Sequence, residues 1–181
     1  MKTHTLATLV LALALNSALA STPHLDAFDL QAFAGHWYEV SRSKNVRLER
    51  GSSTEIDIKL QAENTFHIHH VDKSVNGTIT GSSTARQVSL EDPALFKTHL
   101  NNNFFTRLVS FNLRVLETDY DSYAAVVSVK RIAYLYPVSF CWILSRTPTL
   151  DAKRVKELHA LFEKSGYCTL ADMRGATSSE L

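Results

Sequence analysis

Apolar and polar residues alternate along many short stretches of this chain. The clearest example is Thr54–Leu60, in which Ile56, Ile58 and Leu60 fall on one face of an extended segment and the residues between them are charged. Alternation with a period of two is typical of a β-strand that buries one face. A second such stretch, Phe66–Val71, follows after a turn, so we expect it to return as the neighbouring strand.

Six further strands complete this pattern. They are expected at about His36–Arg42, Thr78–Leu90, Leu95–Leu100, Phe104–Leu116, Tyr123–Val129 and Ser139–Arg146. Asn76-Gly77 supplies the dihedral angles of a tight hairpin turn, and Gly81 is expected to form a bulge where the sheet bends. Eight short strands joined by short turns, with no helix between them, predict an all-β fold. The simplest form is an up-and-down antiparallel barrel, because closure leaves no exposed edge.

The stretch Asp151–Lys164 has a different period. Its apolar residues recur at helical spacing, at Val155, Leu158, Leu161 and Phe162. We expect Gly166 to end this helix and either Thr149 or Asp151 to cap its first turn. One helix therefore follows the eight strands.

The two ends of the chain differ from the part between them. Residues 1–20 hold Lys2, an apolar run and the small residues Ala18 and Ala20, a pattern that predicts a secretory signal peptide. Residues 175–181 are small and polar, and we expect a disordered tail. Residues 21–174 form one expected domain, in which no stretch reaches the ~18 apolar residues of a membrane span. We therefore expect secretion, into extracellular fluid or, in a bacterium, into the periplasm.

Charge and cysteine content narrow the possible partners. The formal net charge is only +1, and Lys2 leaves with the signal peptide. A nearly neutral chain without basic runs offers no surface for nucleic acid or an anionic membrane. The two cysteines, Cys141 and Cys168, belong to an exported protein, in which a disulfide is expected. Two free, buried thiols are the alternative.

Three motifs stand in order along the chain. Gly35-His36-Trp37 opens the first strand, Thr118-Asp119-Tyr120 begins a turn that ends at Tyr123, and Trp142–Arg146 completes the last strand. Together they resemble the lipocalin family, and the run Cys141–Leu150 looks most like its apolipoprotein D and bacterial lipocalin branch. The resemblance covers nearly the whole expected domain. It implies an eight-stranded barrel of the lipocalin (calycin) type with one C-terminal α-helix packed outside.

The resemblance also implies structural roles for the motif residues. Trp37 would lie across the closed end of the barrel, with Gly35 at the entry to its strand. The guanidinium of Arg146 would stack on the Trp37 ring and bond to backbone carbonyls. Asp119 and Tyr120 would fix a loop.

With Arg146 pointing inward, alternation sets the faces of the last strand. The inward residues are Leu144, Trp142 and Phe140, and the outward ones, beneath the helix, are Cys141, Ile143 and Ser145. The helix climbs back over this outer face at ~1.5 Å per residue, which returns Cys168 to the neighbourhood of Cys141. On the first strand the residues expected to share one face are Trp37, Glu39 and Ser41.

A barrel of this size encloses a cavity for a small hydrophobic ligand. The residues expected to line it are Ile56, Ile58, Phe66, Phe96, Phe140 and Trp142. The resemblance implies a binding and transport protein for a fatty acid, lysophospholipid, sterol, retinoid or tetrapyrrole. It implies no cofactor, and a monomer or weak homodimer. The alternative is a core that side chains fill completely.

Arg114 has two readings. Alternation favours Phe111, Leu113 and Val115 as the inward residues and places Arg114 outside, where its charge can reach water. Counting back from the Thr118 motif against relatives places Arg114 inside instead, as a ligand-binding residue for a carboxylate, because a buried cation requires an anionic partner. Both readings stay open on the sequence.

His67, His69 and His70 raise the question of a metal. His67 and His69 share a strand face, but the sequence places no third ligand, so no metal site is expected and surface histidines are the default. Asn76-Gly77-Thr78 matches an acceptor for N-glycosylation, and the hairpin turn explains the same residues equally well.

Two other functions are weighed against ligand binding. Some lipocalins are isomerases that use a cysteine on an early strand, whereas both cysteines here come late, so no enzyme and no catalytic residues are expected. A protein-interaction module, such as part of a pigment complex, would use loops at the open end of the barrel. Tyr134, Leu135 and Tyr136 would suit such a contact.

Overall fold

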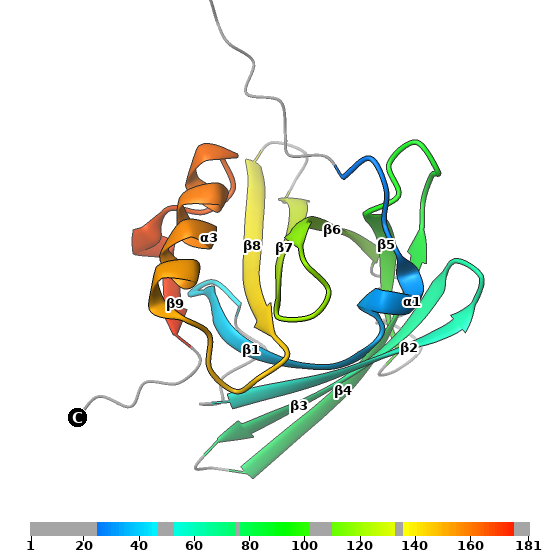
Figure 1. Cartoon of the computed structure of the whole chain (residues 1–181), viewed down its shortest axis with the longest axis horizontal. Helices are drawn as coiled ribbons and strands as arrows, with labels where there is room; N and C mark the ends of the chain where they lie inside the picture. Colours follow the sequence, from blue (N-terminus) through cyan, green and yellow to red (C-terminus); the bar gives the residue numbers. More distant parts are fainter. Residues whose placement is uncertain (1–24, 47–52, 75–76, 102–109, 133–135, 176–181) are drawn as a thin grey trace, which may run out of the picture.

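Eight antiparallel strands close into a barrel in the computed structural model, which describes residues 25–46, 53–74, 77–101, 110–132 and 136–175. The strands are β1 (Gly35–Ser43), β2 (Ser53–Ala62), β3 (Thr65–Ser74), β4 (Gly77–Gln87), β5 (Leu95–Leu100), β6 (Ser110–Thr118), β7 (Tyr123–Ile132) and β8 (Tyr136–Ser145). Each pairs with the next along the chain, and β1 pairs with both β2 and β8 (Figure 1). The predicted eight-stranded antiparallel barrel is confirmed.

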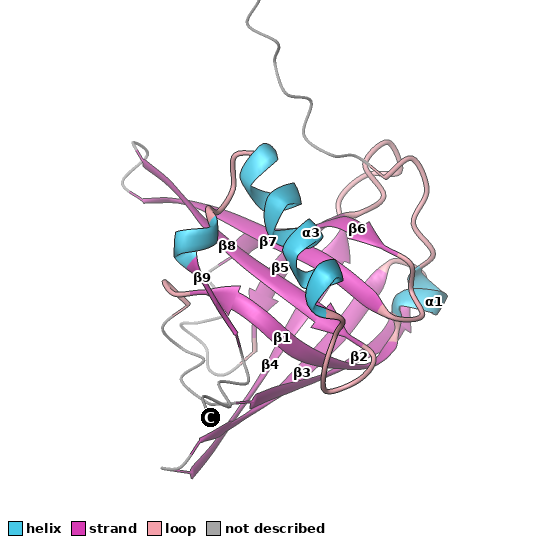
Figure 2. Ribbon diagram, turned by 60° about the vertical axis from the view of Figure 1, so that its left-hand side comes forward, coloured by secondary structure: helices cyan, strands magenta, loops and turns pink. Residues whose placement is uncertain are grey.

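The predicted helix is α3 (Ala152–Lys164), which lies outside the barrel (Figures 1 and 2). Of the two candidate caps, Asp151 fills the position, because its carboxylate accepts hydrogen bonds from the N–H groups of Lys153 and Arg154 at 3.0 and 3.1 Å. Gly166 follows the helix with a φ of +73°, a left-handed conformation that glycine adopts without strain.

Short elements extend the fold at both ends of the chain. α1 (Leu30–Phe33) precedes β1, and its Phe33 is buried. After α3, η1 (Leu170–Asp172) leads into a ninth strand, β9 (Met173–Gly175), which pairs with β1. Gly175, the first residue of the tail predicted to be disordered, is thus part of a strand, and residues 176–181 lie outside the described residues. The predicted signal peptide, 1–20, lies outside the described residues.

A β-bulge divides β1 into two halves with different partners. Up to Glu39 the strand pairs with β2, and the register with β8 shifts between Glu39 and Ser41. Beyond the bulge, Ser41–Ser43 pairs with β9 instead of β2. The extra residue reverses the alternation. The hydroxyl of Ser41 lies 2.9 Å from Nε2 of His159 on α3, outside the barrel, so the prediction that Ser41 shares a face with Glu39 is wrong.

The prediction of a β-bulge at Gly81 is also wrong. β3 and β4 pair without a register shift along the whole of β3. A Cβ atom on Gly81 would lie 2.3 Å from Cε1 of His70, which sits opposite on β3. The glycine therefore makes room for an imidazole ring instead of bending the sheet. β4 ends at Gln87 rather than near Leu90.

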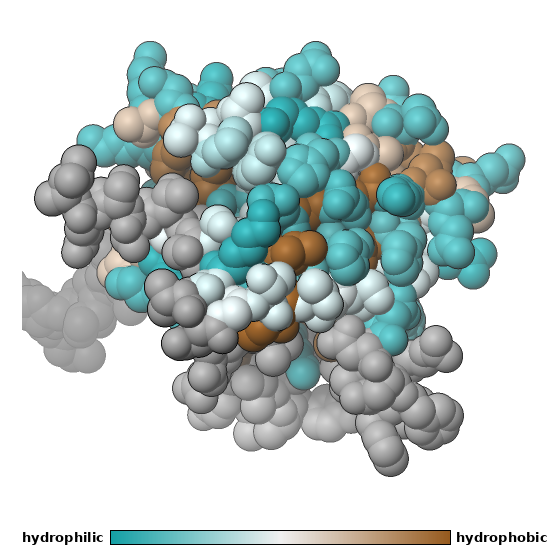
Figure 3. Space-filling model, turned by 90° about the horizontal axis from the view of Figure 1, so that it is seen from below, coloured by the Kyte–Doolittle hydropathy of each residue, from teal (hydrophilic) through white to brown (hydrophobic). Residues whose placement is uncertain are grey.

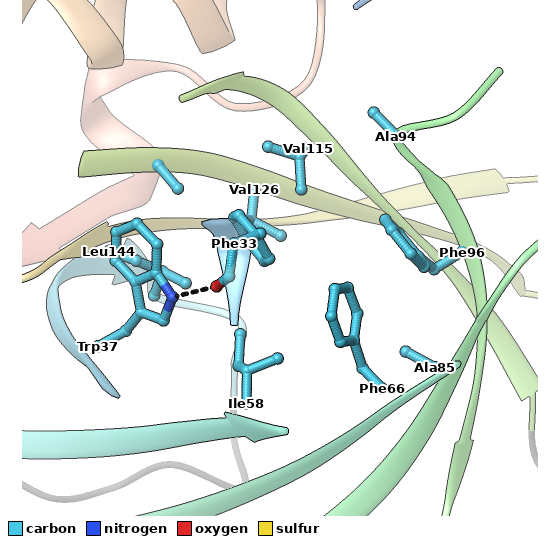
Figure 4. Close-up of a cluster of buried hydrophobic side chains, with 11 residues drawn as sticks. Phe33, Trp37, Ile58, Phe66, Ala85, Ala94, Phe96, Val115, Val126 and Leu144 are labelled. Carbon is cyan, nitrogen blue, oxygen red and sulfur yellow. Dashed lines mark hydrogen bonds between the residues drawn. The ribbon is translucent and has the colours of Figure 1, made fainter. Parts of the chain in front are cut away.

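Two hydrophobic clusters lie on the two sides of the sheet. The inner cluster contains the rings of Phe33, Trp37, Phe66 and Phe96 (Figure 4), and the outer cluster, beneath α3, contains Cys141, Ile143, Leu158 and Phe162. Leu144 belongs to the inner cluster and its neighbour Ile143 to the outer one, as alternation along β8 predicts. The predicted disulfide between Cys141 and Cys168 is confirmed, and it ties the segment after α3 to β8.

Candidate functional site

The end of the barrel at α1, which we call the closed end, is held by Trp37 and Arg146. The guanidinium carbon of Arg146 lies 3.6 Å from the centre of the Trp37 ring, a cation–π contact. The guanidinium donates hydrogen bonds to four backbone carbonyls, those of Ala32 at 2.8 Å, Ala34 at 3.0 Å, His36 at 2.9 Å and Tyr120 at 2.9 Å. The fully buried Trp37 donates its indole N–H to the carbonyl of Phe33 (Figure 4). These contacts join α1, β1 and the loop before β7.

Gly35 makes this close approach possible. Its φ is +109°, a conformation that residues with a side chain rarely adopt. A Cβ atom at this position would also lie only 3.1 Å from Nη1 of Arg146. The backbone conformation and the close approach of Arg146 therefore both favour a glycine at position 35.

Asp119 fixes the loop between β6 and β7. One carboxylate oxygen accepts hydrogen bonds from the N–H groups of Ser122 and Tyr123 at 2.8 and 3.0 Å, and the other accepts the hydroxyl of Ser122. Partial burial alone would raise the pKa of Asp119, but the hydrogen bonds from Ser122 and Tyr123 outweigh it and hold the pKa below its usual value. The ionised carboxylate therefore orders this loop.

Tyr120 connects that loop to the start of the chain. It has a φ of +68°, its N–H donates to the hydroxyl of Thr118 at 3.0 Å, and its own hydroxyl accepts the N–H of Asp29 at 3.1 Å. The carbonyl of Tyr120 is thus held where Arg146 binds it. The hydrogen bonds of Thr118, Asp119 and Tyr120 thus hold backbone groups in place, and none of the three lines the apolar cavity inside the barrel.

An apolar cavity of about 140 Å³ lies inside the barrel, next to the aromatic rings of the closed end. Every strand from β2 to β8 contributes to its wall. Of the predicted lining residues, Ile56, Ile58, Phe66, Phe96 and Trp142 line it, but Phe140 does not. The Phe140 ring instead stacks against Trp142, with 6.3 Å between ring centres.

Three polar side chains interrupt this apolar wall. They are His70 on β3, Ser83 on β4 and Thr98 on β5, which lie on three adjacent strands. The prediction that His70 is a surface histidine is therefore wrong. Alternation from Phe66 carries the inward face to His70, and that signal could have found it. The same pattern from Phe96 leads to Thr98.

A buried charged cluster, Glu39, Arg42, Thr54 and Asp72, lies inside the barrel at the end opposite α1. All four are at most 3% exposed. Arg42 donates to Oε1 of Glu39 at 2.6 Å and to the hydroxyl of Thr54 at 3.1 Å, and that hydroxyl donates to Asp72 at 3.0 Å. Backbone pairing between β1 and β2 stops at Glu39 and Thr54, so these side chains bridge the two strands where their ladder ends.

Arg114 lies on the outer face and does not line the cavity, which corrects its place among the ligand-binding candidates. Its guanidinium makes two hydrogen bonds to the carboxylate of Asp92, at 2.6 and 3.1 Å, and both side chains are 20% exposed. Its neighbour Leu113 lines the cavity instead, so hydrophobic alternation indicated the correct face of β6.

The other candidates give no second site within the described residues. His67 and His69 lie opposite Lys59 and Asp57 on the outward face of β3, and no three His, Cys, Asp or Glu side chains of the described segments converge. Both cysteines of the chain are in the disulfide. Asn76 and the residues 134–135 lie outside the described segments, as does the side chain of Tyr136.

Few large apolar side chains of the described residues are exposed at the surface. On the face in Figure 3, hydrophobic side chains are visible as small separate patches among hydrophilic ones. The two most exposed large apolar side chains of the described residues, Leu90 at 87% and Leu170 at 58%, belong to the loop after β4 and to η1. No helix in the described part of the chain is long and apolar enough to cross a membrane.

Comparison with known proteins gives one consistent result. Residues 28–174 match a family model described as a lipocalin-like domain. Apolipoprotein D of Mus musculus is 27% identical over 147 residues, which covers 81% of this chain and 75% of that protein. Apolipoprotein D of Bos taurus is 30% identical over 146 residues, which covers 77% and 74%.

Solved structures share the fold. Lobster apocrustacyanin A1 superposes with a TM-score of 0.67 at 20% identity, covering 81% of this chain and 78% of that one. The siderocalin Ex-FABP superposes with a TM-score of 0.62 at 16% identity, covering 82% and 91%.

Proposed function

This chain belongs to the lipocalin family, and we propose that it is a secreted protein that binds and carries a small hydrophobic ligand in its barrel. The observation that carries the proposal is the apolar cavity that lies inside the barrel against the rings of Phe66 and Phe96. Burying an apolar chain there contributes about 0.8 kcal/mol per methylene group, with no requirement for a charged partner.

The size of the cavity favours the narrower ligands among those considered. Its 140 Å³ is close to the ~150 Å³ of an engineered apolar cavity that binds benzene, and below the ~300–1,000 Å³ of pockets that enclose drug-sized molecules. The cavity therefore accommodates the end of a ligand, such as an alkyl chain or a single ring. A fatty acid, a lysophospholipid or a retinoid fits this description better than a sterol or tetrapyrrole lying wholly inside.

Catalysis by the route known from lipocalin isomerases has no support in this chain. That route uses a cysteine thiol on an early strand, whereas Cys141 and Cys168 are bonded to each other. The similarity to apolipoprotein D, and the shared fold with the siderocalin Ex-FABP, which functions through dual ligand specificities, both favour binding. We expect a monomer or a weak homodimer, which light scattering would measure.

The first test is native mass spectrometry, with solvent extraction, of protein purified from its natural host. We expect a co-purifying lipid or pigment whose mass names the ligand class. Titration with fatty acids and retinol should then quench Trp142, which lines the cavity, in a saturable manner. Trp142→Phe should abolish most of the response, because the other tryptophan, Trp37, is fully buried at the closed end.

A matched pair of variants on β7 separates the cavity from the outer surface. Val126→Phe places extra atoms in the cavity wall, while Val129→Phe adds the same atoms at a position 36% exposed. We expect Val126→Phe alone to weaken ligand binding at least tenfold, with an unchanged circular dichroism spectrum in both variants. An empty protein that no lipid quenches would overturn the proposal.

A further inference from the structure

The hydroxyl of Thr98 lies in the cavity wall without a partner. Thr98 is 1% exposed, and its Oγ1 makes no hydrogen bond to any of the described residues. Buried hydroxyls are almost always bonded, so each exception requires an explanation. Within the barrel, a ligand oxygen or a water molecule is the group that would supply this missing partner.

Other threonines of the barrel do form hydrogen bonds through their hydroxyls, so the missing partner is particular to Thr98. Thr54, equally buried, accepts a hydrogen bond from Arg42 and donates to Asp72. Thr84, on β4, accepts one from Asn101 at 2.9 Å. Of these three threonines, Thr98 is the one that lines the cavity, and its hydroxyl makes no hydrogen bond.

Ser83 adds a second hydroxyl beside the first. It is 7% exposed and lines the same cavity. Thr98 pairs with Ala85, and Ser83 is the next residue along β4 that faces inward. The two side chains are therefore diagonal neighbours, whose separation of ~7–8 Å or less allows both hydroxyls to approach one ligand oxygen.

The depth of this pair in the barrel is also defined. Thr98 lies one inward position beyond Phe96, which is ~6.6–6.8 Å along the strand. Phe96 packs on Phe66 with 5.4 Å between ring centres, at the apolar base of the cavity. An oxygen bonded to Thr98 is thus separated from that base by roughly the length of one six-membered ring.

We propose that the ligand carries a neutral hydroxyl or carbonyl oxygen near its buried end, and that Thr98 and Ser83 select it. Each hydroxyl both donates and accepts, so the pair suits either group. No lysine or arginine of the described residues lines the cavity, so an ionised carboxylate bonded to Thr98 and Ser83 would lose its hydration without gaining the permanent positive charge of such a residue. The inference rests on the proposed function, since it assumes that the cavity binds a ligand.

The test compares benzene with phenol, which differ only by one hydroxyl and match the size of the cavity. Each probe is titrated by NMR into the wild-type protein, Thr98→Val, Ser83→Ala and the control Thr80→Val, and followed at backbone amides of β4 and β5. Thr80 is exposed on β4, so its variant loses a hydroxyl away from the cavity. We expect Thr98→Val to shift the phenol-to-benzene affinity ratio towards benzene by about tenfold, Ser83→Ala to shift it in the same direction, and the control to leave it unchanged.

Each other outcome has a distinct meaning. If benzene and phenol both bind but their ratio is the same in all four proteins, the selection by Thr98 and Ser83 is overturned while the ligand-binding function stands. If neither probe binds the wild-type protein, the cavity itself is not a binding site and both proposals fall. The melting temperature without ligand gives a second readout, because Thr98→Val removes an unpartnered buried hydroxyl and should not lower it. A lower melting temperature would mean that the hydroxyl stabilises the fold, which contradicts the proposal.

Discussion

Two arginines lie at the two ends of the barrel and are held in different ways. Arg146, at the closed end, donates four hydrogen bonds, all to backbone carbonyls, while its guanidinium rests on the Trp37 ring. Arg42, at the opposite end, is fully buried and donates to the side chains of Glu39 and Thr54. Arg146 is thus bound mainly by backbone carbonyls, whereas the hydrogen bonds of Arg42 are to side chains, which a substitution can remove.

The difference determines what each site can tolerate. Every residue has a backbone carbonyl, so substitutions of the residues around Arg146 leave its four acceptors in place. Only Arg146 itself, with its forked guanidinium, cannot be replaced. The contacts of Arg42 with Glu39 and Thr54 depend on three side chains together, and replacing several of them at once can preserve the barrel. The closed end is therefore the more constrained part, and at the opposite end one substitution can compensate for another.

Loss of the buried cation should have the largest effect. Arg42→Met leaves the carboxylate of Glu39, 3% exposed, without the guanidinium at 2.6 Å, and we expect a loss of about 3–5 kcal/mol in the free energy of unfolding. The double variant Glu39→Leu/Arg42→Met should recover more than half of that loss, as urea denaturation would show. Additive losses would mean that the two residues are not a pair.

Arg146→Met should destabilise the protein by about 2–4 kcal/mol, because it removes four charged hydrogen bonds and the cation–π contact. Arg146→Lys should recover less than half of this, since an ammonium group cannot fork across carbonyls from α1, β1 and the Tyr120 loop. The exposed Arg86→Met provides the control and should change stability by less than about 0.5 kcal/mol. A lysine variant as stable as the wild type would remove the distinction between the two arginines.

Thr54→Val tests the bridge between β1, β2 and β3. The hydroxyl of Thr54 both accepts from Arg42 and donates to Asp72, so its removal should cost about 1–3 kcal/mol. The same change in the Arg42→Met background should cost less, because one of its two partners is already gone. Equal costs in both backgrounds would show that the hydroxyl does not couple to Arg42.

Asp119→Asn should have the smallest effect, about 1 kcal/mol at pH 7, through weaker hydrogen bonds to the loop that presents the Tyr120 carbonyl. The pKa of Asp119 is lower in the folded protein than its ordinary value of 3.8, so the carboxylate stabilises the fold above that value. This contribution disappears as the pH falls through the folded-state pKa. Urea denaturation at pH 7, 5 and 3 should show the difference between wild type and variant shrinking at the lowest pH, and a constant difference would contradict the assignment.

The closed end could be predicted from the sequence because its residues form a pattern. Trp37 and Arg146 occur in motifs, and uninterrupted alternation along β8 placed Leu144 inside and Ile143 outside. The helix was also predictable, since its apolar spacing and the aspartate before it are local signals.

The opposite end could not be predicted in the same way. One extra residue in β1 turns Arg42 inward, and nothing in the run Ser41-Arg42-Ser43 signals a bulge, because a polar run beside a loop is typical of an exposed strand end. His70 follows His67 and His69 in the sequence and so was predicted to lie on the surface with them. Adjacent residues of a strand face opposite ways, however, so His69 and His70 cannot share a face. For Phe140, alternation predicts which face of β8 the side chain is on, but not how far along the barrel axis it lies. It therefore could not show that Phe140 does not line the cavity.

The pairing of β9 with β1 has a consequence for how the chain reaches its folded state. The hydroxyl of Ser41 donates to the carbonyl of Arg174, which is 133 residues later in the sequence. Such distant partners meet slowly, and synthesis delivers the first strand long before the last. Until then one edge of Ser41–Ser43 has no neighbour and can pair with another chain. A chain that ends before Met173 would leave this edge of Ser41–Ser43 unpaired. We expect such a chain to aggregate during refolding, with no loss of ligand affinity in the molecules that fold.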